Sequence, residues 1–165
     1  MKLIQDILSA DLAVIKQELG VESPLHDNLV FKYSTPNEFI NTLKALDDYS
    51  RYPFFFVNSG TVEYDKSNPE EVICSVGEIV IATKTLSTYS SEERDLEVFK
   101  PILNPFLDAF IEQMRYSQGA IISEEGKIKL HYFYGSQGLY GTDGNVFEDS
   151  VDAIQLLNYK FRILK

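Results

Sequence analysis

The side chains that could do chemistry in this chain are few and lie far apart. The two histidines are His26 and His131, and Cys74 is the only cysteine. No pair of these residues has the spacing of metal ligands. The sequence also lacks the Gly-x-Ser-x-Gly and His-Glu-x-x-His patterns of hydrolases. Cys74 lies in an apolar run and is expected to be a small buried hydrophobic residue. The sequence therefore predicts no metal, no cofactor and no enzyme activity.

The remaining polar groups favour structural roles. His131 falls on the polar side of an alternating segment, where an exposed or cross-strand histidine is expected rather than a ligand. Acidic pairs such as Glu92-Glu93, Glu124-Glu125 and Glu148-Asp149 stand where elements end. Capping, turns and solubility explain such pairs better than acid–base catalysis, which needs carboxylates that converge in a cleft.

A glycine-rich stretch, residues 135–144, has glycine at every third position. A phosphate-binding loop would need a helix directly after it and usually a lysine, and the sequence predicts neither there. One interpretation is a flexible loop between two strands. The functional interpretation is an interaction loop, in which Leu139, Tyr140 and Phe147 supply contact area and order on meeting a partner. Tyr64 and Asp65, in the polar connection 58–69, are predicted as further interaction residues.

Composition limits the class of partner. The chain of 165 residues is predicted to form a single domain, 1–165, with 44% hydrophobic and 24% charged residues. Its net charge of −10, from 15 basic and 25 acidic residues, argues against tight binding to a nucleic-acid backbone. One interpretation is an acidic surface that is simply solvated. The other is a surface past which DNA slides without binding. The first residues lack the features of a signal peptide, and no apolar run is long enough to span a bilayer, so no membrane contact is expected.

The first third of the chain, residues 1–50, is predicted to be a helical segment. Apolar residues at helical spacing predict a helix over about 2–19, which Gly20 ends. A second helix is predicted from Thr35, because Thr35-Pro36-Asn37-Glu38 combines an N-cap hydroxyl, a proline at the first helical position and a glutamate at the third.

Residues 51–165 are predicted to form a core of sheet and helices. After a short aromatic strand at 52–57, residues 71–83 predict a strand that is apolar on both faces and therefore covered on both. A bulge at Gly77 would let Glu78 escape burial. Ser90 and Glu93 form a second capping box, and Pro101 and Pro105 predict that the following helix, 91–116, is kinked or divided.

Two alternating segments, 127–134 and 159–165, predict strands with one solvated face, as in antiparallel sheets. The order of helices and strands does not fit a regular βαβ repeat. The expected fold class is α+β, with a mainly antiparallel sheet backed by helices and an N-terminal helical segment.

Three features of the central region carry a family resemblance. They are the aromatic strand Pro53-Phe54-Phe55-Phe56-Val57, the strand end Val80-Ile81-Ala82-Thr83-Lys84-Thr85, and the polar turn into a helix that contains Arg94, Leu103, Pro105, Phe106 and Leu107. Over about residues 50–165 the chain resembles the tail-completion, or tail-terminator, proteins of tailed bacteriophages.

The resemblance implies a non-catalytic structural subunit of a homo-oligomeric ring at the head–tail neck. Such a ring contacts portal or connector proteins and tail proteins, and DNA passes through its lumen without specific binding. The implied location is the neck of the virion, and the host cytoplasm during assembly. Residues 1–50 and the glycine-rich insertion depart from the family pattern, so both a cap on the tail tube and a connector under the portal stay open.

Two other classes remain as alternatives. An acidic protein-binding module, such as an adaptor or an immunity-type protein, would form a tight complex with a basic partner. An enzyme would need a deep pocket with converging polar groups and shifted pKa values.

Overall fold

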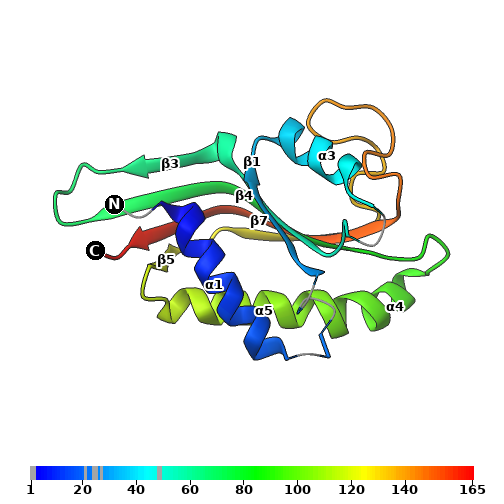
Figure 1. Ribbon diagram of the computed structural model, residues 1–165, viewed down its shortest axis with the longest axis horizontal. Helices are drawn as coiled ribbons and strands as arrows, with labels where there is room; N and C mark the ends of the chain where they lie inside the picture. The colour runs from blue at the N-terminus through cyan, green and yellow to red at the C-terminus, as the bar shows by residue number, and fades with distance from the viewer. Residues whose placement is uncertain (1–2, 21, 24–25, 27, 48–49) are drawn as a thin grey trace.

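A mixed sheet of seven strands organises the molecule (Figure 1). The computed structural model describes residues 3–20, 22–23, 26, 28–47 and 50–165. In chain order the elements are α1 (Ile4–Leu19), β1 (Val30–Ser34), α3 (Pro36–Ala45), β2 (Phe54–Asn58), η1 (Ser59–Thr61), β3 (Val62–Asp65), β4 (Val72–Lys84), α4 (Ser91–Arg94), η2 (Asp95–Leu103), α5 (Asn104–Tyr116), β5 (Ala120–Glu124), β6 (Lys127–His131) and β7 (Val151–Ile163).

The two longest strands, β4 and β7, form the centre of the sheet. Each has 13 residues, and they pair antiparallel from Val72↔Ile163 to Lys84↔Val151. On the outer side of β4 lie β3 and β2, and on the outer side of β7 lie β5 and β6. Only β1 and β2 are described as a parallel pair. The expected α+β fold with a mainly antiparallel sheet is confirmed.

In both central strands, the set of alternate side chains that faces the larger core changes from even-numbered to odd-numbered residues or the reverse, and it does so at the same height in the sheet. On β4, Cys74 and Val76 pack in the same core as Ile79 and Ile81, although the two pairs differ in parity. The break falls at Gly77, and on β7 a matching break falls at Asn158, whose φ is +59°. The pairs on either side are Val76↔Tyr159 and Glu78↔Leu157, so the register is continuous through the break.

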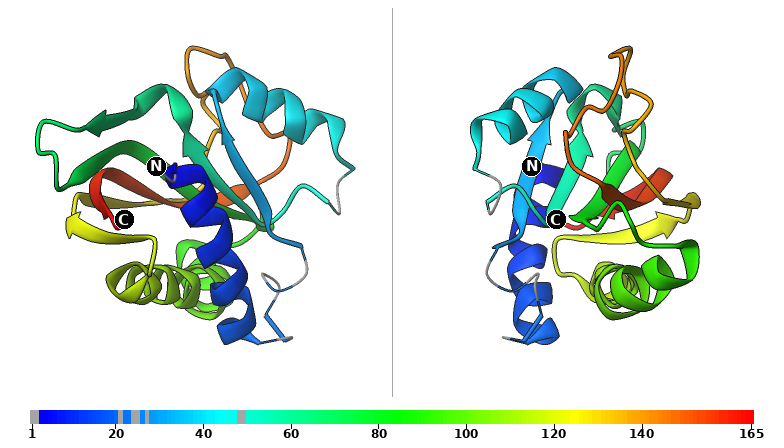
Figure 2. Two further views of the ribbon diagram at one scale, coloured as in Figure 1. Left: turned by 60° about the vertical axis from the view of Figure 1, so that its left-hand side comes forward. Right: turned by 90° about the vertical axis from the view of Figure 1, so that its right-hand side faces the viewer.

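The larger core lies between the sheet and α1, η2 and α5 (Figures 1 and 2). Its helical members are all buried and recur at helical spacing: Ile4, Ile7, Leu8, Leu12, Ile15, Val98, Phe99, Leu103, Phe106, Phe110 and Met114. Asp11 joins α1 to α5, because its carboxylate accepts hydrogen bonds from Gln113 Nε2 and from Ser117 Oγ, each at 2.8 Å.

A second core lies on the opposite face, under α3 and the segment 132–150 (Figure 2). Phe39 of α3 stacks on Phe56 of β2 at 4.1 Å between ring centroids. The start of α3 is the predicted capping box, in which Thr35 N donates to Glu38 Oε2 at 2.9 Å. That bond to the charged form lowers the pKa of Glu38.

Several elements differ from those predicted. Strand β1 falls inside the segment 1–50, for which only helices were predicted, and it is half-buried beside β2. The first helix is α1, and residue 2 of the predicted range lies outside the described residues. The predicted kinked or divided helix is a run of α4, η2 and α5, and η2 is a π-helix that contains Pro101. The last strand, β7, begins at Val151 rather than at 159.

Candidate functional site

The segment 132–150 is the loop for which the sequence predicted an interaction role. It folds back on the sheet through four glycines with positive φ: Gly135, Gly138, Gly141 and Gly144. Phe147 is only 4% exposed, and its ring lies 5.7 Å from that of Phe54 and 5.8 Å from that of Tyr134. Leu139 and Tyr140 are half-buried against the second core. Phe147 is therefore a core residue, whereas binding by Leu139 and Tyr140 stays a prediction.

A buried carboxylate fastens this loop to the sheet. Glu78 is 8% exposed, so the prediction that a bulge at Gly77 frees it from burial is wrong. Its Oε1 accepts hydrogen bonds from Tyr140 Oη at 3.0 Å and Gln155 Nε2 at 2.7 Å, and its Oε2 accepts one from Asn58 Nδ2 at 3.1 Å. Buried charge is tolerated where donors surround it in this way. Burial raises the pKa of the Tyr140 phenol, so this group stays a hydrogen-bond donor.

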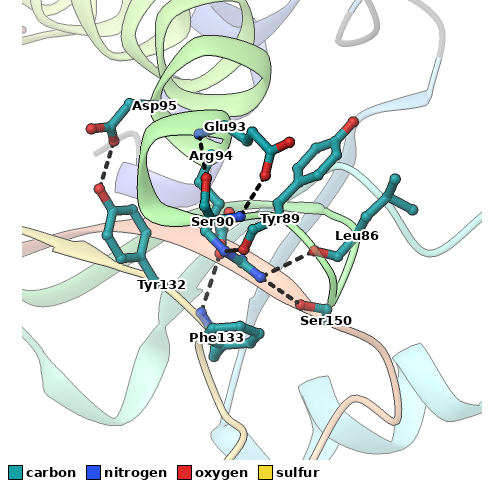
Figure 3. A network of polar contacts seen from close by, with 10 residues as sticks. Leu86, Tyr89, Ser90, Glu93, Arg94, Asp95, Tyr132, Phe133 and Ser150 are labelled. Atoms are coloured by element: carbon teal, nitrogen blue, oxygen red, sulfur yellow. Dashed lines mark hydrogen bonds and ion pairs between the residues drawn. The ribbon is translucent and has the colours of Figure 1, made fainter.

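A second polar network, shown in Figure 3, fixes both ends of the loop. Arg94 is 1% exposed and forms an ion pair with Asp152, which is fully buried. The guanidinium also donates to Leu86 O at 3.1 Å and to Tyr89 O at 3.2 Å. Its Cζ lies 3.7 Å from the centroid of the Phe133 ring, in a cation–π contact.

The ends of the loop converge on this ion pair. Phe133 N donates to Asp152 Oδ1 at 3.1 Å, and Tyr132 Oη donates to Asp95 Oδ1 at 2.6 Å. Burial raises the pKa of Asp152, while the Phe133 N–H and the Arg94 guanidinium act in the opposite direction. Arg94 donates to Leu86 O, Tyr89 O and the Asp152 carboxylate, so the network holds the loop in place.

The other two predicted interaction residues lie on β3. Tyr64 is half-buried, and its hydroxyl oxygen accepts a hydrogen bond from Ile4 N at 3.0 Å, at the start of α1. Burial raises the pKa of Tyr64 to about 12. Asp65 is exposed, and the hydrogen bond from Ser67 N at 2.9 Å lowers its pKa. Interaction through Tyr64 and Asp65 stays a prediction.

On the side of the sheet opposite α1 and α5, none of the described helices covers the part around β3 (Figure 1). A shallow hollow of about 670 Å³ lies on it, lined by Glu63, Tyr64, Asp65, Ile73, Ser75, Ser123, Glu124 and Lys160. Lys160 Nζ lies 2.6 Å from Glu124 Oε2 at its rim. In the part of the chain that the structure describes, no three His, Cys, Asp or Glu side chains are placed to hold a metal ion.

A strand was predicted at β6, but its position at the edge of the sheet was not. Alternation in 127–134 predicted one solvated and one covered face, but Ile128 and Leu130 on the apolar face are 46% and 60% exposed. They lie at the end of the sheet, since β6 pairs only with β7 among the described strands. The signal was present in Lys127 and Lys129, because lysines alternating along a strand are typical of sheet edges.

Comparison with models of known protein families gives no match, and comparison with curated protein sequences gives none either. Among the described helices, none combines the length and the apolar character needed to cross a lipid bilayer.

Proposed function

We propose that this protein is a structural subunit of a ring at the head–tail neck of a tailed bacteriophage, either a tail terminator or a connector. The observation that carries the proposal is the open edge at β6, a strand that pairs with β7 alone among the described strands and on which Ile128 and Leu130 are exposed. Apolar side chains on an open edge favour addition of a strand from another chain.

A closed ring needs two different surfaces on each subunit, because its contacts are heterologous. The sheet supplies them, since described strands end it on both sides: β1 and β3 on the side of β4, and β5 and β6 on the side of β7. Residues of the helices, the loop and both central strands pack into two hydrophobic cores. This packing gives such a subunit a rigid body.

The net charge of −10 supports a lumen through which DNA passes. An acidic wall repels the phosphate backbone and so favours passage over binding. The portal or connector proteins and the tail proteins are the partners that this role requires.

Mass measurement by light scattering and negative-stain microscopy of the purified protein test the proposal. We expect rings in the purified sample, and density for this chain at the neck of the parent particle. Leu130→Asp should lower the ring fraction, whereas Tyr116→Asp, at the exposed end of α5, should not. A mass of one chain under all conditions, with no binding to portal or tail-tube proteins, would overturn the proposal.

The second candidate, an acidic adaptor or immunity-type module, is favoured by the hollow that carries Glu63, Asp65 and Glu124. It predicts a one-to-one complex with a basic protein and no self-assembly. Light scattering of the protein alone and with its co-purified partner separates the two candidates.

A further inference from the structure

The strands at the two edges of the sheet differ in charge. Strand β3, with the sequence Val-Glu-Tyr-Asp, carries two acids, and β6, with the sequence Lys-Ile-Lys-Leu-His, carries two lysines. The other two end strands, β1 and β5, carry one charged residue each, a lysine and a glutamate. Electrostatics therefore single out β3 and β6 as a complementary pair of edges.

The charged side chains of both strands lie on the same side of the sheet. Lys129 is paired with Gln155, whose amide contacts Glu78 on the loop-covered face. On β3, Glu63 and Asp65 line the hollow on the face without helices. Both faces are on the side opposite α1 and α5, since Val62 and Tyr64 of β3 pack against the larger core.

The apolar side chains of the two strands also share a side. Leu130 is paired with Ile154 and Ile128 with Leu156, and both partners belong to the larger core. Directly paired residues project to the same face. The exposed Ile128 and Leu130 therefore project to the same side of the sheet as Val62 and Tyr64.

The strand directions are compatible as well. Each of the pairs β3–β4, β4–β7 and β7–β6 is antiparallel, so β3 and β6 run in opposite directions. In a ring whose axis is parallel to the strands, rotation from one copy to the next leaves the strand directions unchanged. The β3 strand of one copy therefore runs opposite to the β6 strand of the next.

We infer that β3 of one copy pairs antiparallel with β6 of the next copy, with Glu63 opposite Lys129 and Asp65 opposite Lys127. This inference rests on the proposed ring and names the surfaces that close it. In this register Val62 lies opposite Leu130 and Tyr64 opposite Ile128. Two opposite-charge pairs thus form on one face, and the exposed apolar side chains of β6 are covered on the other.

The two edges lie at opposite corners of the sheet. Strand β3 pairs with β4 at 73–76, whereas β6 pairs with the part of β7 that faces β4 at 78–82. Pairing β3 with β6 therefore shifts each copy along the strand direction relative to its neighbour. Closed sheets show the same stagger, which tilts their strands relative to the axis.

Disulfide trapping tests the pairing directly. Glu63→Cys and Lys129→Cys in one chain place two thiols at paired positions, where Cα atoms about 4.5–5.5 Å apart allow a disulfide. Within one chain β4 and β7 lie between them, a separation of about 14 Å at about 4.8 Å per strand, so a disulfide must join two copies. We expect a ladder of oxidised oligomers from the double variant, and dimers only from a mixture of the two single variants. Glu63→Cys with Tyr116→Cys is the matched control and should give no ladder.

Charge reversal supplies the second readout. Lys127→Glu with Lys129→Glu should weaken self-association by about tenfold, because like charges then face each other across the edge. Adding Glu63→Lys and Asp65→Lys to the same chain should restore it. All four side chains are exposed in the isolated chain, so circular dichroism should show an unchanged fold.

The outcomes separate the two proposals. Rings that give no ladder and are insensitive to charge reversal overturn the pairing and leave the ring proposal standing. A chain that remains monomeric at every concentration, gives no ladder and does not bind portal or tail-tube proteins overturns both. A ladder together with rescue by the fourfold reversal establishes the pairing.

Discussion

Gly77 of β4 and Asn158 of β7 are the facing residues at which both central strands reverse their alternation. The neighbours of the two strands change at the same level. β4 passes from pairing with β3 to pairing with β2, and β7 passes from β6 to β5. The reversal keeps apolar side chains directed at α1, η2 and α5 from Val72 to Ile81 of β4 and from Ile154 to Ile163 of β7.

A side chain that does not fit the backbone or the space at either residue should destabilise the sheet. A Cβ at Gly77 would lie 2.6 Å from Thr61 Cβ, so Gly77→Ala should lower the free energy of unfolding by about 1–3 kcal/mol. Asn158→Val should cost about 1–2 kcal/mol, because a β-branched residue is disfavoured at a φ of +59°. Asn158→Gly, which fits that φ, is the control and should retain stability in urea denaturation. Equal losses for Val and Gly at 158 would contradict the conformational explanation.

The buried ion pair should be far more sensitive to single than to double substitution. Arg94→Met leaves the Asp152 carboxylate buried without its cation, so the expected loss of stability is about 3–5 kcal/mol. Arg94→Met with Asp152→Leu should cost less than the sum of the single variants, as a double-mutant cycle measures.

Arg115→Met is the matched control for the ion pair. Arg115 and Glu125 are each 54% exposed and lie 3.3 Å apart, so their pair should contribute about 0–1 kcal/mol. A loss at Arg115 equal to that at Arg94 would show that burial does not determine the effect.

Tyr140→Phe should release the loop 132–150 without unfolding the sheet. It removes one of the donors to the buried Glu78 carboxylate, at a cost of about 1–3 kcal/mol. Hydrogen exchange should become faster in 135–148 and stay unchanged in β4 and β7. Tyr116→Phe, at a side chain that is 76% exposed, should change neither segment. Uniformly faster exchange would contradict a local role for Tyr140.

The Cys74 thiol should be inert in the folded protein. Burial raises its pKa from the ordinary 9.0 to about 11, so at pH 8 the thiolate fraction falls by about 100-fold relative to the unfolded chain. A thiol reagent should therefore label Cys74 only on unfolding, while the introduced Cys of Glu63→Cys labels at once. Rapid labelling of Cys74 in the folded protein would contradict its burial.

The same shift gives a pH dependence of known sign. Because the folded state favours the protonated thiol, this contribution to stability is fully present below pH 9 and is lost as the pH rises through about 11. Cys74→Ala should flatten the stability profile in that window, as urea midpoints at successive pH values would show.

Local signals in the sequence predicted the parts of the fold that depend on local physics. The capping boxes at Thr35 and Ser90 predicted the starts of α3 and α4, apolar residues at helical spacing predicted α1, and apolar runs predicted β2 and β4. The strands β1, β3 and β5, each of four or five residues, were missed, because each is defined by the strand with which it pairs.

The candidate surfaces depend on contacts between distant residues, which the sequence does not display. Phe147 was predicted to be an interaction residue because it is an aromatic side chain in a loop, but it packs against Phe54 and Tyr134. The burial of Glu78 was not predicted, because its hydrogen-bond donors, Tyr140 and Gln155, are 62 and 77 residues away in the sequence. The alternating Lys127 and Lys129 are a sequence signal for an edge strand, but which strand lies beside β6 follows only from its pairing with β7.

The central position of β7 has a consequence for the order of folding. It is the last element in the chain order, yet β4, β5 and β6 all pair with it. Until residues 151–163 leave the ribosome, those three strands lack the neighbour that completes them, and both cores stay open. The sheet is therefore completed only after residues 151–163 have been synthesised, and a slow rate follows from its long-range pairings. During that interval the unpaired edges of those strands favour aggregation and pairing with the wrong strand.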